Sequence, residues 1–263
     1  MIKIIKELSN NVIEEYNNGE TLSALGRKYN LDRRTIRKKL IEYGVEIRPK
    51  YEGRINNFFS TIETPEQAYI LGWIVSDGHL NKNCYRLEIH LQEGDYERIL
   101  FLNNHIPNSK MYQYPDGSWK VYVDSKPLIL DLERLGIPRG KKNIEVKPIN
   151  LNKFLEGYFW AGVFDGDGTV YIPYPGTIRL GITGSKHMCE GFKNYTSWNT
   201  NVIEKKRPEK NWSTVYTISK FYSNPLDFYS TFNKLFSSYS LNNKLFLGRK
   251  LKIMQNFLKK ENT

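Results

Sequence analysis

Two apolar segments of the chain end in the same short pattern, a small residue followed by aspartate and glycine. Residues 70–78 read ILGWIVSDG, and residues 160–168 read WAGVFDGDG. Both read as apolar helices, so Asp77 and Asp167 fall at helix C-termini. There a carboxylate meets the negative end of the helix dipole, which costs a few tenths to about 1 kcal/mol. Stability therefore does not explain the two aspartates, and the pair indicates a functional site.

The small residues in both segments predict that the two helices pack on each other. A small-xxx-small spacing, which lets two helix backbones approach closely, is formed by Gly72 with Ser76 and by Gly162 with Gly166. We expect Gly78 and Gly168 to adopt left-handed C-terminal turns, so that the carboxylates converge at the base of the pair. Two like charges brought together require a cation, and oxygen ligands without nearby His or Cys favour Mg²⁺.

The regions downstream of the two segments also repeat. After the first, the sequence predicts strands over 79–81 and 85–92, a helix over 95–105, strands over 110–114 and 119–124, and a helix over 127–135. After the second, it predicts strands over 169–172 and 178–183, a helix over 186–195, strands over 202–207 and 213–219, and a helix over 225–236. The shared order is αββαββα, with a last basic helix over 241–259. We therefore predict an α+β fold of two half-domains with pseudo-two-fold symmetry, residues 63–150 and 151–263.

The two segments resemble the signature helices of the LAGLIDADG homing endonucleases. The second matches closely, while the first keeps Gly72, Asp77 and Gly78 but has Val75 where the family often has an aspartate. With the flanks FFSTIETPEQAY and INLNKFLEGYF, the resemblance covers about residues 58–257. It implies a monomer with tandem LAGLIDADG repeats that cuts both strands of a long asymmetric or pseudo-palindromic DNA target.

The resemblance also implies site residues. In the family the aspartate before the final glycine of each motif is the metal ligand. This assigns Asp77 and Asp167 to Mg²⁺, with Mn²⁺ as a substitute and Ca²⁺ binding without supporting cleavage. The metal would activate water and stabilise the leaving 3′ oxygen. The family also places a basic residue near each scissile phosphate. In the first half this is Lys141 or Lys142, with Lys142 favoured, and in the second it is Lys244, with Lys250 next.

Two residues beside the motifs are interpreted differently. Asp165 lies two residues before Asp167 and has no counterpart at Val75, so we interpret it as a structural hydrogen-bond acceptor. His79 directly follows the first motif, but Thr169 replaces it in the second half. We therefore interpret His79 as part of the wall of the site.

Alternation along the strands predicts which side chains contact DNA, because successive residues face the helix layer and the groove in turn. In the first half the outward candidates are Arg86, Glu88, His90, Gln92, Tyr112, Gln113, Lys120 and Tyr122. In the second half they are Arg179, Lys205, Arg207, Tyr216 and Lys220. A shift of one residue in register would turn either set to the other face.

Residues 9–44 predict three short helices without a strand. The first spans 11–17 and stops at Gly19, Thr21 caps a second over 22–29, and Asp32 caps a third over 33–43. The third helix should turn Ile36, Leu40 and Ile41 inward. Its outward cations are Arg33, Arg34, Arg37 and Lys38.

This order, a capped helix, a turn and a helix with a cationic N-terminal half, is typical of a major-groove reader. The segment GETLSALGRKYNLDRRTIRKKLIEYGV resembles the helix-turn-helix of resolvase-type recombinases and small regulators. We predict a helix-turn-helix DNA-binding domain over residues 1–48 and a linker over 49–62. A solvated basic helix on a helical hairpin is the alternative.

The composition agrees with a nucleic-acid partner. Lys and Arg number 39 against 28 Asp and Glu, a net charge of +11, which makes a polyanion the first partner to consider. No apolar stretch reaches the roughly 20 residues that span a bilayer, and residues 1–9 are too short and mixed for a secretory signal. We expect an intracellular, cytoplasmic protein of a bacterial or phage-infected cell, with Cys84 and Cys189 as reduced thiols outside any zinc site.

Two other functions remain open at this point. A transcriptional regulator could keep the scaffold for binding alone, although loss of a motif carboxylate would then be expected and both are present. An RNA maturase that assists intron splicing could use the same basic surface. The helix-turn-helix favours DNA, because the deep groove of A-form RNA admits no helix.

Overall fold

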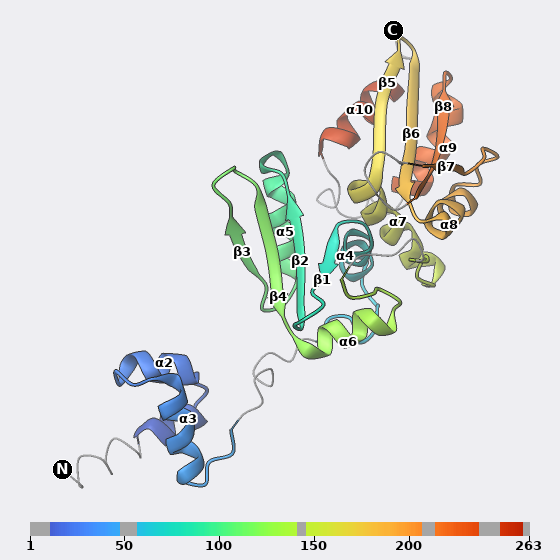
Figure 1. Cartoon of the computed structure of the whole chain (residues 1–263). Coiled ribbons are helices and arrows are strands. Elements are labelled where there is room, and N and C mark those ends of the chain that lie inside the picture. Colours follow the sequence, from blue (N-terminus) through green and yellow to red (C-terminus); the bar gives the residue numbers. More distant parts are fainter. Residues whose placement is uncertain (1–10, 48–56, 141–145, 207–213, 237–247, 260–263) are drawn as a thin grey trace. The chain divides into compact units, whose positions relative to one another are not determined.

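The computed structural model describes residues 11–47, 57–140, 146–206, 214–236 and 248–259. The chain divides into two compact units, Met1–Ile55 and Asn56–Thr263 (Figure 1). No helix in the described part of the chain is long and apolar enough to span a bilayer.

The N-terminal unit is a small helical cluster. Residues 11–17 are helical, and α2 (Leu22–Lys28) and α3 (Arg33–Glu42) follow, capped by the side chains of Thr21 and Asp32. Gly19 ends the first helix with a φ of 106°, a conformation that favours glycine. The core of the unit is formed by Val12, Tyr16, Leu25, Ile36 and Leu40.

The inward face predicted for α3 is wrong at one residue. Ile36 and Leu40 are buried, but Ile41 is 48% exposed. Leu40 lies one helical turn after Ile36 on the same face, whereas the next residue is rotated by about 100°.

The larger unit begins with two copies of one arrangement. The first contains α4 (Pro65–Ser76), β1 (Gly78–Leu80), β2 (Arg86–Leu91), a short 3-10 turn η2 (Glu93–Asp95), α5 (Tyr96–His105), β3 (Lys110–Gln113), β4 (Trp119–Asp124) and α6 (Lys126–Arg134). The second contains α7 (Lys153–Asp167), β5 (Gly168–Tyr174), β6 (Thr177–Gly184), α8 (Lys186–Thr196), β7 (Ile203–Lys205), β8 (Val215–Tyr222) and α9 (Pro225–Phe236). A final helix, α10, spans Gly248–Leu258.

Each copy forms a four-stranded antiparallel sheet. The strand orders are β1-β2-β4-β3 and β5-β6-β8-β7, so equivalent strands occupy equivalent places. Helices cover one face of each sheet (Figure 1). Alternate residues of β2 are buried on that face, Leu87, Ile89 and Leu91, as are Ile178, Leu180 and Ile182 of β6. The predicted α+β fold with two αββαββα repeats is confirmed.

Residues 57–62 belong to the larger unit. Phe59 is fully buried in its core and Phe58 packs on that core. The side chain of Gln67 donates to the carbonyls of Phe58 and Thr61, and Arg134 donates to those of Phe59 and Ser60. The aromatic pair thus packs on the repeats, while residues 49–56 of the predicted linker lie outside the described residues.

Candidate active site and nucleic-acid interface

The two motif helices contact each other through their main chains. A Cβ on Gly72 would overlap the carbonyl oxygen of Phe159, and a Cβ on Gly162 would overlap that of Tyr69. No side chain fits at either point, so glycine at both positions lets the two helices approach. The structure thus places Gly72 and Gly162 where the spacing predicted.

The same contact continues to the carboxylates. A Cβ on Gly166 would overlap Oγ of Ser76 and would lie 2.7 Å from Oδ2 of Asp77. Asp77 caps the C-terminus of α4, and Asp167, next to Gly166, is the last residue of α7. The two carboxylates therefore lie at the same end of the helix pair. Asp77 is exposed and Asp167 half-buried, so a ligand can reach both.

The predicted left-handed turns at Gly78 and Gly168 are wrong. Neither glycine has a positive φ; Gly168 has φ −78° and ψ 146°, and the two residues start β1 and β5. Glycine is needed for space instead. A Cβ on Gly78 would lie 2.7 Å from the carbonyl oxygen of Ile74, and one on Gly168 would overlap that of Phe164. Each strand therefore leaves its helix by folding directly against the last turn.

Among the described residues, Lys250 of α10 contacts this end of the helices with its side chain. Its ammonium group donates to the carbonyls of Phe164 and Asp165, at 2.8 and 2.6 Å. It thereby binds two carbonyl groups in the last turn of α7, where helix carbonyls begin to run out of backbone donors; that of Phe164 also accepts from the N–H of Gly168. Burial lowers the pKa of Lys250 to about 8, against the opposing charges of Asp165, Asp77 and Asp167. The sequence favoured Lys244 over Lys250; Lys244 and Lys142 both lie outside the described residues.

The donor set at the helix ends fits a hard divalent cation. It consists of carboxylate oxygens, and within the described ranges no three His, Cys, Asp or Glu side chains gather as a closed metal cage. Mg²⁺ suits such a site, because it is held by one or two carboxylates and keeps several waters or phosphate oxygens. Asp77 and Asp167 would be its ligands.

Asp165 has the structural role expected of it. It is 2% exposed, and Oη of Tyr69 donates to its Oδ2 at 2.6 Å. The bond crosses between the two helices, since Tyr69 lies on α4 and Asp165 on α7. Burial and the charge of Asp165 raise the pKa of Tyr69 well above its usual value, which keeps the phenol a donor.

The first sheet turns a network of charges away from its helices. Outward residues of β2 and β4 are Arg86, Glu88 and His90, and Lys120, Tyr122 and Asp124. Glu88 lies 3.3 Å from the Lys120 ammonium and 3.8 Å from the His90 ring. His79, on β1 opposite Glu88, is exposed on the same face. The charges of this surface are therefore largely paired within it.

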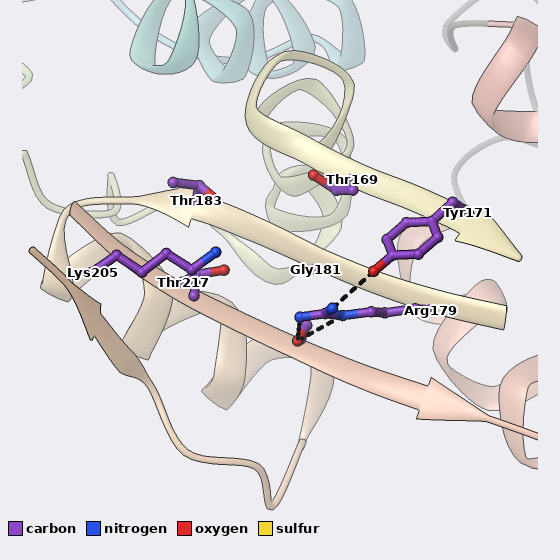
Figure 2. A pocket seen from close by; sticks show the side chains of 8 residues that line it. Thr169, Tyr171, Arg179, Gly181, Thr183, Lys205 and Thr217 are labelled. Atoms are coloured by element: carbon purple, nitrogen blue, oxygen red, sulfur yellow. Dashed lines mark hydrogen bonds between the residues drawn. The ribbon is translucent and has the colours of Figure 1, made fainter. Parts of the chain in front are cut away.

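The second sheet presents a hollow with few charges (Figure 2). Arg179 of β6 and Lys205 of β7 are its cations, and hydroxyl and aromatic groups surround them. Its lining residues come from all four strands: Thr169, Tyr171, Arg179, Gly181, Thr183, Lys205, Thr217 and Ser219. The register places every one of them on the face opposite the helices.

Three of the expected outward residues face the wrong way. Gln113 shares its side of the sheet with Met111, which packs on the core. Tyr216 and Lys220 share theirs with the buried Ile218 and Tyr222. The edge strand β3 shows no clear alternation of buried and exposed residues. In β8, as in β6, the even-numbered residues face the helices, whereas the sequence prediction turned Tyr216 and Lys220 outward. Gln92 lies beyond β2, and Arg207 lies outside the described residues.

In the N-terminal unit the predicted cations are exposed. Arg33, Arg34, Arg37 and Lys38 all lie on the solvent side of α3, and Lys38 makes a loose ion pair with Glu42 at 3.8 Å. Gly26 of α2 is buried, and a Cβ there would lie 2.7 Å from the carbonyl oxygen of Leu31. This close approach fixes the turn between α2 and α3.

Comparison with known proteins identifies the fold. No protein-family model matches the chain, and no curated protein matches it by sequence. Among solved structures, the LAGLIDADG meganuclease I-AabMI bound to uncleaved DNA matches with a TM-score of 0.50 and 13% identity, over 76% of this chain and 91% of that one. The chain has the LAGLIDADG fold.

Two further solved structures have similar values. The LAGLIDADG meganuclease I-CpaMI bound to uncleaved DNA gives a TM-score of 0.49 and 13% identity, over 75% of this chain and 90% of that one. The LAGLIDADG homing endonuclease I-GzeII in complex with its DNA target gives 0.49 and 13%, over 75% and 89%. Within the LAGLIDADG fold, α4 and α7 are the two motif helices. Each of the two sheets has one face that points away from the helices.

Proposed function

We propose that this chain is a site-specific DNA endonuclease that cuts both strands of a long target as a monomer and depends on Mg²⁺. The observation that carries the proposal is the convergence of Asp77 and Asp167 at one end of two helices in main-chain contact. Each half of the chain supplies one carboxylate. A single chain thus has the two acidic groups that a paired cleavage of two strands requires.

The aspartates and Lys250 have different roles in the site. Asp77 and Asp167 would hold the metal, which would supply activation of water and stabilisation of the leaving 3′ oxygen. Lys250 anchors the last turn of α7 through two carbonyl groups and so fixes the direction of Asp167. Its positive charge also offsets part of the repulsion among the carboxylates. Mn²⁺ should substitute for Mg²⁺, and Ca²⁺ should support binding without cleavage.

Double-stranded DNA is the partner that the surfaces support. The outward faces of the sheets carry side chains that bond to base edges and phosphates, and the net charge of +11 favours a polyanion. The exposed cations of α3 support a second contact through a helix-turn-helix. A binding-only regulator would have no need of two convergent carboxylates, and no observation favours an RNA target. We further propose that the protein acts inside a cell, in the cytoplasm of a bacterium or phage-infected host.

Selection of cleaved duplexes from a randomised DNA library in Mg²⁺ tests the proposal. The wild type should enrich one long site and bind it as a 1:1 complex by mass photometry. Asp77→Asn and Asp167→Asn should each reduce double-strand cleavage by about a hundredfold or more while still binding the site in Ca²⁺. Asp227→Asn, at an exposed position of α9, is the control and should cut normally. Near-normal cleavage by either motif variant would refute the metal assignment.

A further inference from the structure

Arg86 and Arg179 occupy equivalent positions in the two sheets. In the first sheet Gly78 pairs with Ile89, and Arg86 lies three residues before Ile89. In the second, Gly168 pairs with Ile182, and Arg179 lies three residues before Ile182. Both arginines face away from the helices. A symmetric protein would use them for the same task.

The residue opposite each arginine differs. Arg86 pairs with Asp124 across β2 and β4, whereas Arg179 pairs with Phe221 across β6 and β8. The guanidinium of Arg86 makes a two-pronged bond to Asp124, at 2.7 and 3.0 Å, and lies 3.7 Å from Glu88. The positive charge of Arg86 is therefore paired with carboxylates of its own sheet, and Asp124 holds one side of its guanidinium.

Neutral groups hold Arg179 instead (Figure 2). Its Nε and Nη2 donate to Oγ of Ser219, at 3.2 and 2.9 Å, and its Nη1 donates to Oη of Tyr171 at 2.8 Å. The guanidinium also lies over the rings of Phe221 and Tyr171, at 4.8 and 5.8 Å. Among the described residues no carboxylate forms an ion pair with Arg179, so its charge is held in place without being neutralised.

The second sheet has a different residue at the position equivalent to Glu88. Glu88 lies one residue before Ile89, and the equivalent residue before Ile182 is Gly181. A Cβ on Gly181 would overlap the carbonyl oxygen of Ile218, so no carboxylate fits there. The missing side chain leaves the hollow beside Arg179 open.

Arg179 retains the donors needed to read a base. A guanidinium has five N–H groups, and the three bonds above use one on each nitrogen. One N–H therefore remains on each terminal nitrogen without an acceptor among the described residues. Two adjacent donors match the O6 and N7 acceptors of guanine, which is the commonest specific contact of arginine in the major groove. Because the side chain is already held, little rotamer entropy is lost on binding.

We propose that Arg179 reads a guanine in the half of the target that lies under the second sheet, while Arg86 makes no base contact. The two halves of the target are thus read by different chemistry despite the symmetry of the fold. This inference rests on the proposed DNA target. A phosphate offers similar acceptors, but the open hollow and the neutral neighbours of Arg179 favour a base.

The test compares base preferences of variants on a randomised duplex library bound in Ca²⁺. The wild type should prefer guanine at one position by about 5- to 150-fold. Arg179→Ala should lose that preference alone and leave the other positions unchanged. Phe221→Asp should lose the same preference with Arg179 still present, because it places opposite Arg179 the carboxylate that Asp124 places opposite Arg86. Phe221 is 52% exposed, so the substitution disturbs no core packing.

Arg86→Ala is the matched comparison and should leave every base preference in place. Thermal melting of each variant shows that it is folded. If Arg86→Ala loses the base preference at a position where the wild type has one, the proposal that only Arg179 contacts a base is overturned. A uniform loss of affinity in Arg179→Ala, with the salt slope reduced by nearly one, would assign Arg179 to a phosphate and overturn the base contact. If the wild type enriches no sequence at all, the proposed function fails and this inference with it; enrichment without a guanine dependent on Arg179 refutes the inference alone.

Discussion

The phenol of Tyr69 donates a hydrogen bond of 2.6 Å to the buried carboxylate of Asp165, and this bond joins the two LAGLIDADG helices. The equivalent pair on the other side of the pseudo-two-fold axis is Phe159 and Val75, which can form no such bond. The helix pair is therefore symmetric in its main chain and asymmetric in its polar contacts.

Tyr69→Phe should destabilise the larger unit by about 1–3 kcal/mol, because it leaves a buried carboxylate oxygen without its donor. Urea unfolding followed by tryptophan fluorescence measures the change. Tyr229→Phe, at a 52% exposed position, is the control and should change stability by less than about 0.5 kcal/mol. Equal effects of the two substitutions would mean that the cross-helix bond contributes nothing to stability.

Gly162→Ala should destabilise the protein more than the addition of a single methyl group usually does. The added methyl group would overlap the Tyr69 carbonyl and force the two helices apart, at a cost of about 1–3 kcal/mol or more. Because the carboxylates lie at the end of the same contact, cleavage should fall as well. Gly94→Ala is the matched control, since a Cβ there meets nothing within 4 Å. A melting temperature of Gly162→Ala equal to that of Gly94→Ala would contradict the main-chain contact.

Lys250→Met should separate maximal cleavage rate from metal affinity. The variant keeps the apolar stem but removes the bonds to Phe164 and Asp165, so the last turn of α7 loosens and cleavage slows. Removing a cation beside Asp77 and Asp167 should at the same time lower the Mg²⁺ concentration needed for half-maximal rate. Titration of the cleavage rate with Mg²⁺ reports both quantities. A slower rate with an unchanged or raised Mg²⁺ requirement would show that the charge of Lys250 does not act on the carboxylates.

The two cysteines should react very differently with a thiol reagent such as Ellman's reagent. Cys189 is fully buried, and burial raises its pKa to about 12, while Cys84 is partly exposed. At pH 8 Cys189 therefore stays in the thiol form, whereas the thiolate is the reactive form. The native chain should therefore show one fast thiol and the urea-unfolded chain two. Two fast thiols in the native chain would show that Cys189 is accessible.

Removal of residues 1–50 should weaken DNA binding, flatten its salt dependence and shorten the footprint at one end only. The log-log slope should fall by nearly one for each phosphate that the shortened chain no longer neutralises. The cut position should stay the same, because Asp77 and Asp167 remain. Alanine at all four exposed cations of α3, in the full chain, separates the effect of their charge from that of the whole module. An unchanged footprint after truncation would leave the N-terminal unit without a role in DNA binding.

The order and type of the elements could be predicted because their signals are local. The predicted bounds of β4 and α9 match those of the structure, and the caps at Thr21 and Asp32 bond as expected. The repeat of two motifs with matching downstream patterns indicated the topology. The placement of Asp77 and Asp167 at helix ends depends on the same local signals.

Contacts between distant segments could not be predicted. Lys250 reaches carbonyls 85 and 86 positions away, and nothing near it in the sequence sets it apart from the solvated lysines of a basic helix. The pairing of Arg86 with Asp124 depends on the register of β2 and β4, which the sequence pattern left open. Glycine can be required either for a left-handed turn or for a close contact, and the sequence alone does not tell which applies at Gly78 and Gly168. Only the packing against Ile74 and Phe164 shows that glycine is needed there for space.

The glycine contact between α4 and α7 sets the distance between the two backbones that carry Asp77 and Asp167. No rotamer change in a strand can alter it, because no side chain lies in the contact at Gly72 or Gly162. New target sequences can therefore be acquired by substitutions on the outward faces of the sheets, one residue at a time, without moving the chemical centre. The same contact makes the helix pair intolerant of substitution at Gly72 and Gly162, so tolerated substitutions in this protein should be concentrated on the strands.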